Sequence, residues 1–216
     1  MRTDRTRTAA HRFLAIGLLA AVTAAAAACG SAANVSQAAP APGAVQTANT
    51  AAATAAPVTV HLYMTILTGG QNGKKGWPEY VPGNFTVPAN SIVDVEIRDF
   101  DDGPATIPTG GNQVKGTIGG TMQVIDAVNG PVEQQPAKTV TEIPANDVAH
   151  TLTFATKDFS LNVPIPPLST VEFSFKAPAA GTYLWQCDSA CGSGTSGWSG
   201  PMATNGWMQG IMTVTQ

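Results

Sequence analysis

The chain has 216 residues, of which only 12% are charged, and it contains 22 glycines and 16 prolines. This length allows one large core with extensions, and few charges with many turn-forming residues favour an all-β domain. Residues 1–28 hold four arginines and one aspartate, so seven basic and thirteen acidic residues remain beyond them. That balance leaves no basic patch, and we do not expect nucleic-acid binding.

The first 28 residues form a secretory signal, with positive charge up to residue 12 and an apolar run from 13 to 28. Cys29 follows three alanines and precedes Gly30 and Ser31. This resembles the lipobox of bacterial lipoproteins, although Ala26 stands where leucine is more common. The resemblance implies that Cys29 is lipidated and holds an exported protein on the outer face of the bacterial cell membrane. An ordinary cleavage site and an uncleaved anchor are the alternatives.

Residues 29–57 are rich in alanine, proline and threonine and carry no charge. Such a composition cannot build a core, and it predicts a disordered tether. No second apolar stretch approaches the length of a membrane span. The folded domain is therefore expected to occupy residues 58–216.

Alternating apolar residues predict the first strands of this domain. Val58–Leu67 is the first, and His61 falls on its polar face as an exposed strand histidine, which we favour over a metal ligand. A loop is expected over residues 68–83. Phe85–Pro88 and Ile92–Ile97 predict two further strands.

An acidic turn and an insertion are expected next. Asp99, Asp101 and Asp102 predict a solvated turn, because a calcium loop needs more ligands at regular spacing. Residues 103–146 are interpreted as an insertion, in which glycine pairs flank a hairpin with Met122–Ala127 as one arm.

The stretch from residue 147 to 191 combines strand patterns with metal-binding side chains. His150 opens one alternating strand, and Val171 lies in a second. A turn at Gly181–Tyr183 then leads to Cys187, and Cys191 follows four residues later. Imidazole and thiolate are ligands that select soft or borderline metals, copper first.

Two segments resemble the copper A domain of cytochrome c oxidase subunit II, a cupredoxin. They are Asp147–His150, with its D-V-x-H pattern, and Gly181–Gly192, which carries Q-C-x-x-x-C-G. The resemblance implies a cupredoxin-like Greek-key β-sandwich, a copper site and electron transfer. We expect the site residues to converge at one end of the sandwich.

The family pattern is interrupted after the second cysteine, where the family continues with a histidine and a methionine. This chain instead has Thr195 and an inserted glycine- and serine-rich loop. Aligned from the closing strand, Asn205 takes the histidine position and Met208 the methionine position. The expected metal ligands are therefore His150, Cys187, Cys191 and Met208, with Met202 as a spare thioether. Trp198 and Trp207 either cover this site or anchor the loop.

Three classes of function fit these residues. The protein is an electron carrier near a respiratory chain, or a copper-binding or copper-delivery lipoprotein with a protein donor or acceptor. The third reading is a metal-free scaffold that binds a protein partner and carries a Cys187–Cys191 disulfide. We do not expect an enzyme, because no Ser-His-Asp constellation, acid pair or nucleotide loop is present.

Overall fold

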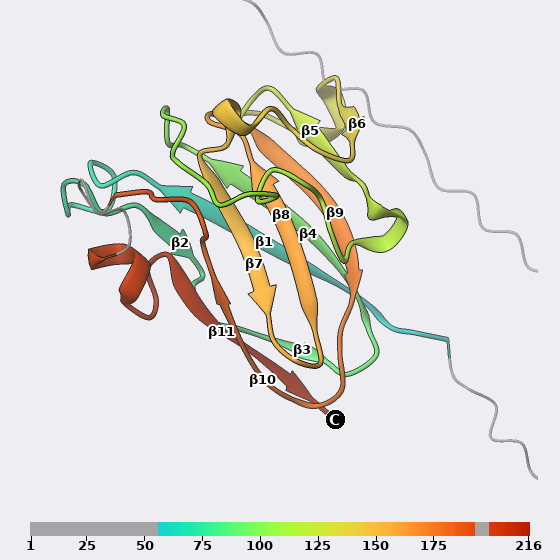
Figure 1. The fold of residues 1–216 in the computed structure, drawn as a ribbon. Coiled ribbons are helices and arrows are strands. Elements are labelled where there is room, and N and C mark those ends of the chain that lie inside the picture. The colour runs from blue at the N-terminus through green and yellow to red at the C-terminus, as the bar shows by residue number, and fades with distance from the viewer. Residues whose placement is uncertain (1–55, 193–198) are drawn as a thin grey trace, which may run out of the picture. The chain divides into compact units, whose positions relative to one another are not determined.

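Strands and short turns of 3₁₀-helix build the protein in the computed structural model, which describes residues 56–192 and 199–216 (Figure 1). All described residues belong to one structural unit, Ala52–Gln216. The predicted lipid site Cys29, the signal segment, nearly all of the tether and Trp198 lie outside the described residues. The strands are β1 (Thr59–Leu67), β2 (Glu79–Val81), β3 (Phe85–Pro88), β4 (Ile92–Asp99), β5 (Met122–Ile125), β6 (Lys138–Val140), β7 (His150–Ala155), β8 (Ser160–Ile165), β9 (Thr170–Lys176), β10 (Gly181–Gln186) and β11 (Gln209–Thr215).

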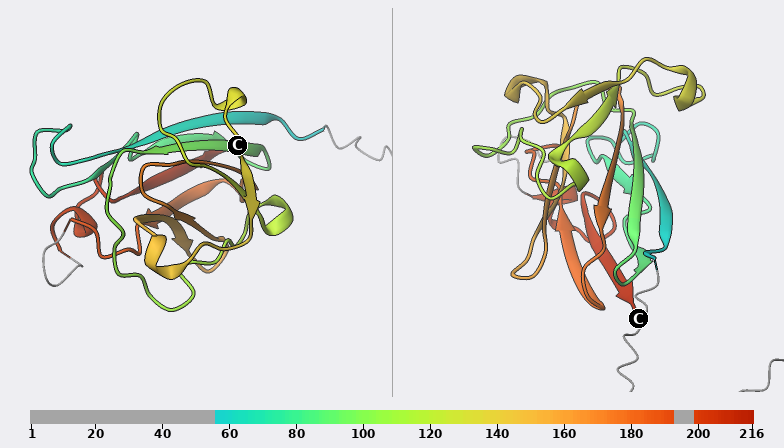
Figure 2. Two further views of the ribbon diagram at one scale, coloured as in Figure 1. Left: turned by 90° about the horizontal axis from the view of Figure 1, so that it is seen from above. Right: turned by 90° about the vertical axis from the view of Figure 1, so that its right-hand side faces the viewer.

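The strands form two sheets that face each other across the core (Figure 2). One sheet has the order β2-β1-β4-β9-β5-β6 and the other the order β3-β11-β10-β7-β8. The pairs β1–β4 and β3–β11 are parallel, and the remaining pairs are antiparallel. This confirms the predicted fold class, an all-β, cupredoxin-like Greek-key sandwich. No helix among the described residues has the length and apolar character that a membrane crossing requires.

Two local expectations need correction. The segment expected to be a loop over residues 68–83 contains β2, which pairs with the end of β1. The expected turn at Gly181–Tyr183 is the first half of β10, which pairs with β11 from its first residue. β2 could not be predicted because its three residues are too few to show alternation. The start of β10 was predicted as a turn because the strand begins at a glycine.

Side-chain alternation explains which face of β4 enters the core. Val93, Val95 and Ile97 are buried, and the same alternation continues to Asp99, which is also fully buried. A carboxylate thus occupies a core-facing position, where a charged group needs a partner. That partner is a histidine of the opposite sheet, described below.

Large aromatic side chains fill the core next to that position. The rings of Tyr80 and Trp185 meet edge to face, 4.9 Å apart. The Tyr80 hydroxyl donates to the Thr151 carbonyl at 2.9 Å, and Trp185 Nε1 donates to the Gly83 carbonyl at 3.0 Å. These bonds satisfy the polar atoms of both rings and link β2 to β7 and β10.

The expected insertion contributes to both sheets. β5 and β6 form a hairpin on one edge of the six-stranded sheet, as the sequence predicted for Met122–Ala127. Lys115 forms a backbone bridge with Asn162 of β8, whose side-chain amide donates to the carbonyls of Gly111 and Gln113. Residues from this region therefore extend the outer strands of the sandwich.

Candidate metal centre

His150 is the first residue of β7, and its ring is fully buried between the sheets. It shares an inward face with Leu152 and Phe154, as the alternation predicted. Its two ring nitrogens meet different chemistry. Nδ1 lies 3.9 Å from Cys187 Sγ, and Nε2 lies 3.2 Å from an oxygen of Asp101.

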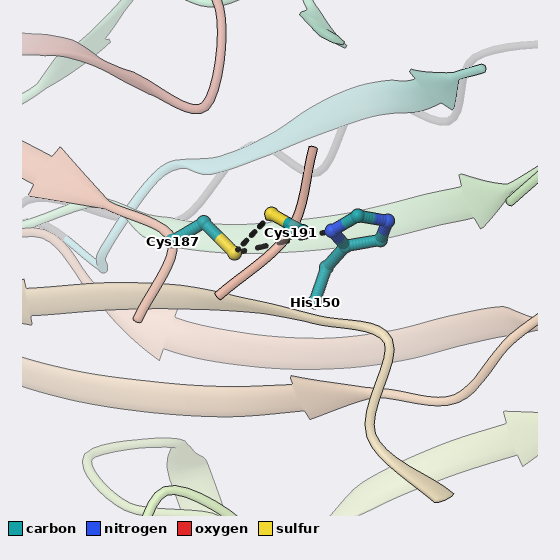
Figure 3. Close-up of side chains that lie close together, drawn as sticks. All are labelled: His150, Cys187 and Cys191. Carbon is teal, nitrogen blue, oxygen red and sulfur yellow. Dashed lines mark hydrogen bonds between the residues drawn. The ribbon is translucent and has the colours of Figure 1, made fainter. Parts of the chain in front are cut away.

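The two cysteines follow directly after β10, and both are buried. Their sulfurs are 3.5 Å apart, so they are two thiols and not a disulfide, in which the sulfurs would be about 2.05 Å apart (Figure 3). The Thr151 amide donates to Cys187 Sγ at 3.3 Å, and the Cys187 amide donates to the Met208 carbonyl at 2.8 Å. Backbone bonds from β7 and the last loop thus hold Cys187 in place.

A segment of the expected insertion forms backbone hydrogen bonds with both parts of the chain that carry the candidate ligands. The Ala105 amide donates to the Val148 carbonyl, two residues before His150, at 2.8 Å. The amide of Ala190, the residue before Cys191, donates to the Thr106 carbonyl at 2.7 Å. Residues 105–106 therefore bridge the start of β7 and the cysteine loop.

The geometry of His150, Cys187 and Cys191 fits a single metal ion. Their ligand atoms all lie within 4.8 Å of one another. Imidazole and thiolate bind an ion at about 2.0–2.3 Å, which places neighbouring ligand atoms roughly 3.3–4.0 Å apart. The observed separations of 3.5 Å between the sulfurs and 3.9 Å between Nδ1 and Cys187 Sγ fall in this range. The third pair, His150 and Cys191, is separated by up to 4.8 Å, so these two side chains would move closer together when an ion binds.

The structure distinguishes the two candidate methionines. Met202, on the 3₁₀-helix η5 (Gly200–Ala203), is buried, and its Sδ lies 3.3 Å from Cys191 Sγ. Met208 is fully buried, and it is joined to the site through its backbone carbonyl, which accepts from Cys187. The thioether that contacts a thiol is thus that of Met202, which the sequence had indicated only as a spare. Side-chain ligation by Met208 stays a prediction.

Two aspartates form the other side of the site, and the expected solvated turn is wrong for both. Asp99 is fully buried, with one oxygen 3.8 Å from His150 Nε2. Asp101, whose side chain is 28% exposed, accepts from the same nitrogen at 3.2 Å. A carboxylate on the distal nitrogen of a histidine fixes the ring and its tautomer, and leaves Nδ1 to face the thiols.

The charges in the site reinforce one another. Burial raises the pKa of Asp99 to about 7, although nearby His150 lowers it. The hydrogen bond from His150 holds the pKa of Asp101 below its usual value. Burial alone would lower the pKa of His150, but Asp99, Asp101 and Cys187 outweigh it and raise it to about 10. In the site without an ion the pKa of His150 is thus raised, and an ion that binds Nδ1 would displace the proton there.

The pKa values of the two thiols shift in opposite directions. Burial disfavours the Cys187 thiolate, but hydrogen bonds from Cys191 and His150 outweigh it and bring the pKa of Cys187 well below its usual range. The hydrogen bond to Cys187 and burial raise the pKa of the Cys191 thiol. The pKa of Cys187 is thus the lowered one of the pair, and the thiolate is the form that ligates metals.

Other residues singled out from the sequence lie elsewhere. Asn205, which the alignment from the closing strand placed at the histidine position, is exposed. His61 has an exposed side chain, 3.8 Å from Asp94, as the interpretation as an exposed strand histidine predicted. It lines a groove of about 440 Å³ on the outer face of the six-stranded sheet, which does not include the thiols.

Trp207 anchors a loop. Its ring meets that of Trp77 edge to face at 5.1 Å, and the Lys74 ammonium lies 3.0 Å from the Trp77 ring centre. This cation–π contact ties residues 74–77 to the segment before β11. Of the two roles considered for this tryptophan, the contacts support anchoring.

No protein-family model and no curated protein sequence matches the chain. Solved structures do match. Dithionite-reduced auracyanin from the photosynthetic bacterium Roseiflexus castenholzii is 16% identical, with a TM-score of 0.33, and the match covers 74% of this chain and 99% of that one. Auracyanin A, a blue copper protein from the green thermophilic photosynthetic bacterium Chloroflexus aurantiacus, is 18% identical, with a TM-score of 0.33 and coverage of 73% and 99%.

A heme-copper terminal oxidase is also similar, at 16% identity and a TM-score of 0.30, over 62% of this chain and 51% of the oxidase chain. Likenesses of this strength do not bear on metal or activity.

Proposed function

We propose that this protein is an exported, lipid-anchored copper-binding protein that holds copper(I) at His150, Cys187 and Cys191. The observation that carries the proposal is the buried convergence of one imidazole and two sulfurs within 4.8 Å. Two thiolates and an imidazole suit copper(I), and when bound the ion would supply a one-electron or transferable metal centre. Its protein partners would be a donor or acceptor of copper or of electrons.

Copper handling is the form of this function that the ligand set favours. The chain has three histidines: His11 in the signal segment, the exposed His61, and His150. A blue-copper centre needs two histidines and one cysteine, and copper A likewise has a second histidine in the family pattern. With one imidazole and two thiols, the site is suited to one copper(I) ion rather than to either redox centre.

The alternative is a metal-free scaffold in which Cys187 and Cys191 are joined by a disulfide. The short distance of 3.5 Å between the sulfurs favours it, because oxidation would need little movement. A bridge across so short a loop restrains little chain entropy, and the paired carboxylates on His150 would then have no evident use. We therefore rank it second.

The test is copper(I) binding by the reduced chain without oxygen, measured against a chromogenic chelator. We expect one copper per chain and protection of both buried thiols from alkylation. His150→Ala should weaken binding, whereas the matched control His61→Ala should not, because His61 is exposed and distant from the thiols. Absence of binding, or a disulfide that forms even when copper is supplied during export, would refute the proposal in favour of the scaffold.

The membrane anchor makes a separate prediction. Because a lipidated cysteine is the only attachment proposed, Cys29→Ser should move the protein from the membrane fraction to the soluble fraction. The measurement is fractionation followed by immunodetection, with Cys191→Ser as a thiol control that should stay on the membrane. Unchanged fractionation of the Cys29→Ser protein would contradict the anchor.

A further inference from the structure

We infer that Met202 is a thioether ligand of the site and makes it prefer copper(I) to zinc(II). This inference rests on the proposed function, because it concerns the same ion. It assigns the thioether to η5, in the segment inserted after the cysteines, and not to Met208, which alignment from the closing strand had indicated.

Four potential ligand atoms follow one another through the site. Nδ1 of His150 is 3.9 Å from Cys187 Sγ, which is 3.5 Å from Cys191 Sγ. Met202 Sδ extends the series at 3.3 Å from Cys191 Sγ. The Met202 side chain is 2% exposed, so its sulfur lies in the same dry interior as the thiols. The Met202 sulfur thus adjoins the cluster of His150, Cys187 and Cys191 through its contact with Cys191.

The position of Met202 is fixed by the backbone that carries it. The Pro201 carbonyl on η5 accepts from the Met208 amide at 3.1 Å, and the Met208 carbonyl accepts from the Cys187 amide at 2.8 Å. The Thr204 hydroxyl donates to the Gly200 carbonyl at 2.8 Å. η5 is therefore connected through the backbone of Met208 to the start of the cysteine loop.

The donor set predicts selectivity. Thioether sulfur is a soft ligand that suits copper(I). Structural zinc sites in proteins use thiolate, imidazole and carboxylate. Removing the Met202 sulfur should therefore weaken copper(I) and leave zinc(II), which needs only His150 and the two thiolates.

The experiment compares the reduced full chain with Met202→Leu and the matched control Met212→Leu, at a fully buried methionine of β11. Both changes keep volume and burial, so folding should tolerate them. Copper(I) and zinc(II) affinities are measured by competition with chromogenic chelators. We expect Met202→Leu to weaken copper(I) on the order of tenfold or more, since even indirect partners of metal ligands contribute that much. Zinc affinity should not change, and Met212→Leu should change neither. Equal copper affinity for Met202→Leu and wild type, or an equal loss for zinc, overturns the inference.

A second measurement keeps the inference testable if Met202→Leu does not fold. The chain has six methionines, which can all be replaced with selenomethionine. Copper X-ray absorption should then show a copper–selenium distance in wild type and in Met208→Leu. A copper-loaded Met208→Leu chain without selenium at the ion overturns the inference alone. A wild-type chain that binds no copper(I) overturns the proposed function, and the inference with it.

Discussion

Cys187→Ser is expected to abolish copper(I) binding at micromolar protein concentration. Cys187 Sγ lies at the centre of the cluster, 3.5 Å from Cys191 Sγ and 3.9 Å from His150 Nδ1. It is also the thiol whose pKa lies well below its usual range, because hydrogen bonds from Cys191 and His150 outweigh burial. A serine hydroxyl stays protonated and is a hard donor, so the variant lacks the central soft ligand. The loss of copper(I) affinity should exceed the ~10–100-fold loss that follows when a residue hydrogen-bonded to a metal ligand is removed.

The measurement is competition with a chromogenic copper(I) chelator. The parent protein carries Cys29→Ser, so that Cys187 and Cys191 are its two cysteines. The rate at which Cys191 of the variant is alkylated should then be the same with and without copper, whereas copper should slow the alkylation of both thiols in the parent. Thermal unfolding of the metal-free variant reports whether the fold is intact. If a folded Cys187→Ser chain retains the affinity of its parent, the ion is not bound at this cluster.

Gly210→Ala is expected to destabilise the fold by roughly 3 kcal/mol, the upper end of the usual cost of overpacking. A Cβ on Gly210 would overlap the carbonyl group of Gly83 and lie 2.8 Å from Trp185 Nε1. The Gly83 carbonyl accepts the Trp185 hydrogen bond, and Gly210 is opposite Trp185 in the sheet. The added methyl group must therefore displace backbone, or break a buried hydrogen bond of the largest core side chain.

Urea unfolding followed by tryptophan fluorescence measures this effect. Gly103→Ala is the matched control, because a Cβ there meets no atom within 4 Å. It should change stability by no more than about 1 kcal/mol, as compatible glycine-to-alanine changes do. Equal unfolding midpoints for Gly210→Ala and the parent would show that Gly83 and Gly210 are not in close contact.

Most of the strands could be predicted from alternation. Phe85–Pro88 was predicted with the bounds of β3, and Val58–Leu67 differs from β1 by one residue. These segments alternate over enough residues for one face to be buried. The three-residue strands β2 and β6 carry no such signal, because their edge positions are defined by neighbours distant in sequence.

The site was predicted in part for a related reason. His150, Cys187 and Cys191 were recognisable by type and by their places next to strands. Asp99 was not, because an aspartate near other aspartates indicates a turn. Its signal was present, since it continues the alternation of Val95 and Ile97 in β4. The position of the Met202 sulfur could not be predicted, because a loop with many glycines does not fix which of its residues returns to the core.

The bridge formed by residues 105–106 limits how this domain could be simplified. We interpreted residues 103–146 from the sequence as an insertion into a shorter core, and an added loop can normally be excised with little consequence. Here its backbone joins the peptide that leads into His150 to the peptide beside Cys191. A shortened domain without this region would keep every proposed ligand but lose the backbone hydrogen bonds that connect the segments carrying them. A trimmed or grafted version of the domain should therefore retain residues 105–106.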